Sequence, residues 1–132
     1  GGTRRYSERS LVLLRTSCDR FVALRAEEDV RDLVAENVRF HAVVLAAAGS
    51  DRLSEMVGQV VQLPLVYRSY HWYSPEQKLI SEHYHRQLTA ALTARDAERA
   101  ERVMTEHVLE ARDFLVARLR AKACEHDSEE GE

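Results

Sequence analysis

The stretch Asn37-Val38-Arg39-Phe40-His41 is the part of this 132-residue chain around which the predicted fold is organised. On an α-helix, Asn37 and His41 lie one turn apart on the same face. The same face carries apolar residues at helical spacing, namely Val30, Leu33, Val34, Val44, Leu45 and Ala48. The pattern predicts a buried helix face that two polar side chains interrupt. Such side chains need partners, because a buried polar group left unpaired costs about 1–3 kcal/mol.

The composition is that of one soluble helical domain. Hydrophobic residues make up 45% of the chain and charged residues 31%, with only five glycines and two prolines to interrupt helices. The net charge of −3 argues against bulk attraction to nucleic acid or an anionic membrane. No apolar run approaches the length of a membrane span. Cys18 and Cys124 are far apart, which favours free thiols in a reducing cytoplasm, so a cytoplasmic protein is expected.

Periodicity and capping residues predict an all-α, antiparallel bundle of about five to six helices, and the histidines described below predict a metal site in its core. The first helix spans about residues 8–25, and the second ends near Ala48, before Gly49. A third helix, capped by Ser50 or Asp51, reaches Pro64 and kinks there. Ser74-Pro75-Glu76-Gln77 forms a capping box at the start of the fourth helix. Asp96 caps the fifth, which runs to about residue 123.

Two later histidines, His85 and His107, repeat the anomaly of a polar group on an apolar helix face. One such histidine is more simply explained as a packed imidazole, so the argument depends on three of them converging with His41. Three imidazoles facing one core suit a divalent ion, and they favour zinc, with nickel, manganese and iron as alternatives. Asn37 can add its amide oxygen. A helical interaction domain with merely packed histidines remains an alternative.

Catalytic metal sites are the competing class. A di-iron bundle needs two Glu-x-x-His motifs, and only Glu82-x-x-His85 is present. A hydrolytic zinc site needs a general base beside the ion, and Glu82 and Glu106 lie off the stripes that carry the histidines. We therefore expect that the chain is not an enzyme and keep a stand-alone metal-dependent hydrolase as the alternative.

The aromatic stretch from Tyr67 to Tyr73 contains one arginine, Arg68. Guanidinium groups bind carboxylates bidentately, so Arg68, with Tyr67 beside it, is the candidate to hold a small organic acid next to the metal. The simpler interpretation is that the aromatic residues pack beside the kink and that Arg68 is a solvated surface charge.

The string Asn37-x-x-Phe40-His41, followed by Ala46-Ala47-Ala48-Gly49-Ser50, resembles the D/N-x-x-F-H…A-x-G-N segment of a known family. The family is the FadR-type C-terminal (FCD) effector-binding domain of GntR-type bacterial transcription regulators. The segment from His85 to His107 is similar to its H-x-x-[IL]…A-[IL]…D…A…M…H signature. The similarity covers about residues 10–120.

This resemblance implies a helical domain whose metal is held by an Asp or Asn and three histidines, here Asn37, His41, His85 and His107. The family's commoner first ligand is Asp, so the neutral Asn37 is expected to weaken metal affinity. The resemblance further implies a small carboxylate effector and a homodimer. It also implies that DNA is bound only through a winged helix-turn-helix domain, which this chain lacks. Residues 9–123 then form the ligand-binding domain, 1–8 a tag remnant or truncation edge, and 124–132 a disordered acidic tail.

Overall fold

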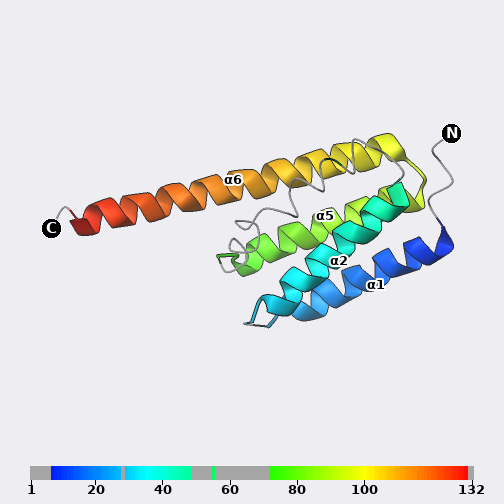
Figure 1. Ribbon diagram of the computed structural model, residues 1–132, viewed down its shortest axis with the longest axis horizontal. Helices are drawn as coiled ribbons and strands as arrows, with labels where there is room; N and C mark the ends of the chain where they lie inside the picture. The colour runs from blue at the N-terminus through cyan, green and yellow to red at the C-terminus, as the bar shows by residue number, and fades with distance from the viewer. Residues whose placement is uncertain (1–6, 28, 49–54, 56–71, 131–132) are drawn as a thin grey trace.

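The computed structural model describes residues 7–27, 29–48, 55 and 72–130, and its regular elements there are all helices (Figure 1). They are α1 (Glu8–Leu24), α2 (Arg31–Ala48), α5 (Pro75–Thr93) and α6 (Ala97–Glu130). The all-α prediction is confirmed with these four helices. The predicted third helix and the kink at Pro64 lie outside the described residues, so a count of five to six is not shown. None of the described helices is long and apolar enough to cross a membrane.

The capping residues of the sequence start the helices where they were expected, with one difference. Ser74 accepts a hydrogen bond from the backbone N–H of Gln77 at 3.1 Å, and Pro75 occupies the first turn of α5. The Gln77 side chain does not return to the cap as a capping box requires. Its Nε2 instead donates to Glu110 Oε1 at 2.8 Å, which ties the start of α5 to α6.

A tight junction between α5 and α6 turns the chain back on itself. Arg95 adopts φ 57°, in the left-handed region, which costs a residue with a Cβ about 1–2 kcal/mol. Asp96 then caps α6, because its Oδ1 accepts from the backbone N–H of Arg99 at 3.0 Å. This short connection makes α6 antiparallel to α5, as Figure 1 shows.

The directions of the helices determine which residues of different helices lie at the same level, that is, at the same height along the bundle axis. α1 runs antiparallel to both α2 and α5, so α2 and α5 run in the same direction (Figure 1). Two contacts define the register of α1 relative to α5. Cys18 Sγ lies 3.4 Å from Thr89 Oγ1, and Lys78 Nζ donates to the carbonyl of Arg25 at 3.3 Å. A buried apolar cluster joins all four helices, and it contains Leu14, Phe40, Val44, Leu88, Leu92 and Met104.

The last helix is longer than the sequence patterns indicated. α6 continues to Glu130, so residues 124–130 are helical and not the expected disordered tail. The stretch from Ala97 to Glu130 contains no glycine or proline and is rich in Ala, Arg, Lys and Glu, which are strong helix formers. The side chains of residues 119–128 are exposed, so local propensity rather than burial accounts for this extension.

Candidate metal centre

Three histidines from three helices meet in the bundle: His41 on α2, His85 on α5 and His107 on α6. Their ring centroids form a nearly equilateral triangle with separations of 5.3 Å (His41–His85), 5.4 Å (His85–His107) and 5.5 Å (His41–His107). One nitrogen of each ring lies within 4.8 Å of the other two. A tetrahedral zinc site spaces its nitrogens by about 3.4 Å. The side chains therefore need to approach one another by no more than about 1.4 Å to share an ion.

Aromatic contacts orient the central imidazole. The ring of His85 stacks on Phe40 and meets the edge of Phe21, with the Phe21 and His85 centroids 4.9 Å apart. Phe21 and Phe40 are among the largest fully buried side chains of the described residues. His85 is therefore positioned by close packing. His107 is partly exposed, and its ring lies 5.2 Å from that of Tyr84.

The hydrogen-bonding state of the imidazoles fits a metal. His41 Nδ1 and His85 Nε2 are buried, and neither has a hydrogen-bond partner among the described residues. Buried polar atoms are almost always paired in folded proteins, so two unpaired ring nitrogens on two neighbouring imidazoles require an explanation. An ion bound between the rings would supply the missing partner.

The protonation state of the histidines fits as well. Burial, and to a smaller extent His107, lowers the pKa of His41 to about 3. Burial lowers the pKa of His107 to about 4. The pKa of His85 falls well below its ordinary value, chiefly through burial and further through His41 and His107. All three rings are therefore neutral near pH 7, which is the form that binds metal ions.

Asn37 lies one turn before His41 on α2 and is 5% exposed. Its Oδ1 is buried and has no hydrogen-bond partner among the described residues. An amide oxygen in that condition is available to an ion, so the expectation that Asn37 is a fourth ligand stays a prediction with this observation in its favour.

Two buried carboxylates were not anticipated from the sequence. Glu36 is paired with Arg39 and lies 3.9 Å from Arg20, and Glu82 is paired with Arg25 and with Arg86 at 3.1 Å. The arginines at the i+3 and i+4 positions were a visible signal, because such pairs are neighbours on a helix. Since arginines engage both carboxylates, neither is placed as a free base at the triad.

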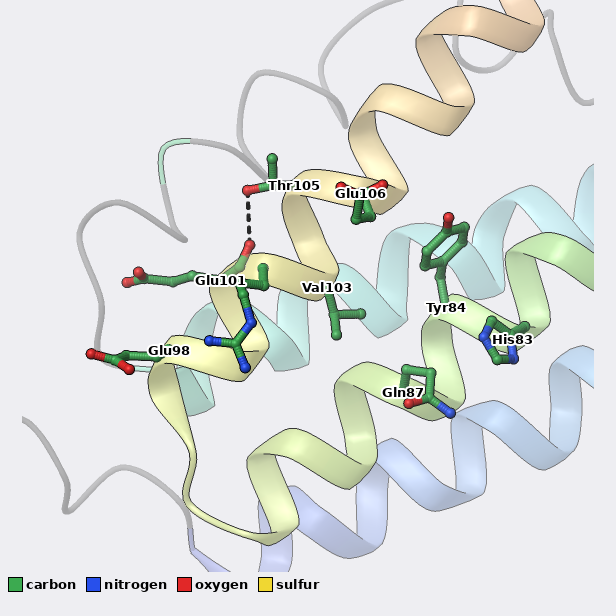
Figure 2. A pocket seen from close by; sticks show the side chains of 9 residues that line it. His83, Tyr84, Gln87, Glu98, Glu101, Val103, Thr105 and Glu106 are labelled. Atoms are coloured by element: carbon green, nitrogen blue, oxygen red, sulfur yellow. Dashed lines mark hydrogen bonds between the residues drawn. The ribbon is translucent and has the colours of Figure 1, made fainter.

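A groove of about 700 Å³ lies beside the triad, between α5 and α6 (Figure 2). His83 and Tyr84 line it from α5, and Glu98, Glu101 and Glu106 line it from α6. Burial raises the pKa of Tyr84, and Glu110 and Glu106 raise it further, so its hydroxyl stays protonated. Tyr84 both lines the groove and contacts the His107 ring, so the groove adjoins the triad at this side chain.

The structure thus brings together His41, His85 and His107, which the sequence analysis proposed as ligands. His83 and His126, which were not proposed as ligands, are exposed. The proposed effector-binding residues Tyr67 and Arg68 lie outside the described residues.

Comparison with known domain families matches residues 2–110 to the FCD domain. No curated protein and no solved structure matches the chain.

Proposed function

The chain belongs to the FCD family, the FadR-type C-terminal domains of GntR regulators, and from that premise we propose that it senses a small organic acid at an ion held by His41, His85 and His107. FCD domains are effector-binding and regulatory rather than catalytic. The observation that carries the proposal is the pair of buried, unpaired ring nitrogens, His41 Nδ1 and His85 Nε2, within a cluster of three imidazoles.

His41, His85 and His107 would hold the ion through nitrogen, and Asn37 through its amide oxygen. Three imidazoles favour zinc, with nickel, manganese and iron as alternatives. A bound ion supplies a positive charge and open positions to which a carboxylate oxygen binds. The chain's own residues orient the rings, as Phe21 and Phe40 do for His85, and keep them neutral by burial.

The effector in this proposal is a small carboxylate, with Arg68 and Tyr67 as further contacts. Because the triad joins α2, α5 and α6, a ligand at the ion acts on the relative positions of three helices at once. A ligand that binds one packing arrangement better than another shifts the population toward it. In a cytoplasmic homodimer, that shift would alter the placement of DNA-binding domains lying outside residues 9–123.

The test is a zinc titration of the chelator-treated protein, followed by thermal melting. The wild-type chain is expected to gain thermal stability with zinc, because an ion that binds only the folded state stabilises it. His107→Ala should abolish the gain, and His83→Ala, which changes an exposed histidine of α5 outside the triad, should keep it. A wild-type melting curve that zinc leaves unchanged would contradict the proposal and support merely packed histidines.

A further inference from the structure

We propose that Ser81 is a positioning residue of this centre, whose hydroxyl group donates a hydrogen bond to a carboxylate bound beside the three histidines. Nothing in the family match concerns this side chain. The inference rests on the proposed function, because the carboxylate is held there by the ion.

The first observation is the state of the Ser81 hydroxyl. Ser81 is 3% exposed, and its Oγ is buried without a hydrogen-bond partner among the described residues. Hydroxyl groups of serine and threonine within helices either point to solvent or donate to the carbonyl four residues earlier. Three threonines of α5 and α6 do this: Thr89 to His85 at 2.9 Å, Thr93 to Thr89 at 2.7 Å and Thr105 to Glu101 at 2.8 Å. Ser81 leaves this common arrangement unused, so its hydroxyl is free for another partner.

The second observation is the level of Ser81 in the bundle. Ser81 lies one turn before His85, and Asn37 lies one turn before His41. α2 and α5 run in the same direction (Figure 1). Residues one turn before the histidine of each helix are therefore on the same side of the triad. α6 runs in the opposite direction, so the residues that follow His107 lie on the same side of the triad as Ser81 and Asn37. The hydrogen bond from Gln77 of α5 to Glu110 of α6 is consistent with that register.

The polar groups on this side divide into different roles. Asn37 Oδ1 has no hydrogen-bond partner and can only accept or ligate, whereas the Gln77 amide already donates to Glu110. Ser81 is thus the polar residue of this level with a hydroxyl still to donate. A carboxylate bound through one oxygen presents its second oxygen as an acceptor, and a neutral hydroxyl matches it.

The test compares Ser81→Ala with Ser17→Ala. Ser17 is a matched control, because it too is 3% exposed with an unpaired buried Oγ, but it lies on α1, which carries none of the three histidines. Each full-length variant is titrated with Co²⁺, and the loaded protein is then titrated with acetate, both followed by visible absorption. Melting temperatures without metal report on folding. They should not fall in Ser81→Ala, because the substitution removes an unpaired buried hydroxyl.

We expect Ser81→Ala to bind Co²⁺ within about threefold of the wild type and acetate about tenfold more weakly, the typical effect of one lost hydrogen bond. Ser17→Ala should match the wild type in both titrations. Unchanged acetate affinity in Ser81→Ala, or equal losses in the two variants, would overturn the role of Ser81 alone. No acetate binding by the Co²⁺-loaded wild type would overturn both the carboxylate site of the proposed function and this inference. A wild-type chain that binds no Co²⁺ would overturn the proposed function and this inference with it.

Discussion

The ring of Phe40 lies flat against the imidazole of His85, with centroids 4.1 Å apart and planes inclined by 11°. Phe40 precedes His41 in the chain, so two neighbouring residues of α2 contribute to the centre in different ways. Phe40 packs on the imidazole of His85 on α5, and His41 contributes its own imidazole to the triad. The apolar core and the histidine triad therefore depend on the same turn of α2.

Shortening Phe40 should loosen His85 as well as the core. Phe40→Leu is expected to lower the free energy of unfolding by about 1–3 kcal/mol, in the range of core substitutions, and to weaken zinc affinity. Val44→Ala, another buried position of α2, should be destabilising without the same loss of affinity. Urea unfolding and a chelator competition titration measure the two quantities. Equal zinc affinities in both variants would show that the stacking does not position His85.

The metal-free protein, prepared by chelator treatment, should lose stability as the pH falls from about 6.5 toward 4. In the folded state, the pKa values of His41 and His107 are lowered to about 3 and about 4, whereas in the unfolded chain they are near 6.5. Between these values the unfolded chain binds more protons, so the free energy of unfolding decreases with falling pH and is fully retained above 6.5. Each such histidine contributes up to about 1.4 kcal/mol per pH unit.

Urea midpoints measured between pH 7.5 and 4.5 check this dependence. His107→Gln removes one titrating group, so its curve should be shallower than that of the wild type. Parallel curves for the two proteins would argue against a lowered pKa of His107 in the folded state.

Asn37 should contribute to metal affinity without being essential. If Asn37 is a ligand as proposed, Asn37→Asp adds a negative charge next to the ion and is expected to raise zinc affinity at least tenfold, whereas Asn37→Ala should lower it several-fold. His107→Ala should lower it much further, since a nitrogen ligand is lost. Competition with a coloured chelator ranks the variants. If the three substitutions at these two positions left the affinity unchanged, the ligand set would be wrong.

Glu82 should matter for stability and not for metal binding. Its carboxylate is engaged by Arg25 of the segment after α1 and by Arg86 of α5. Glu82→Ala leaves both arginines without this partner and is expected to cost about 1–3 kcal/mol in the free energy of unfolding. Zinc content per folded chain should stay at the wild-type level. A loss of zinc without a loss of stability would instead place Glu82 at the ion.

The sequence predicted the parts of this structure that depend on local patterns. Helical periodicity was enough to place His41, His85 and His107 on inward faces, and the caps at Ser74 and Asp96 formed as expected. The parts it missed depend on contacts between helices. The Gln77 side chain donates to Glu110 of α6 and not to the N-terminal end of α5, and Glu82 is paired with Arg25 from a distant part of the chain.

X-ray absorption spectroscopy of the zinc-loaded protein tests the central claim most directly, because it reports the ligands of the ion itself. The account predicts about three imidazole nitrogens at 2.0–2.1 Å and an oxygen shell, with the imidazole signal reduced in His107→Ala. A spectrum of hydrated zinc without imidazole scattering, or one that is identical in His107→Ala, would contradict it.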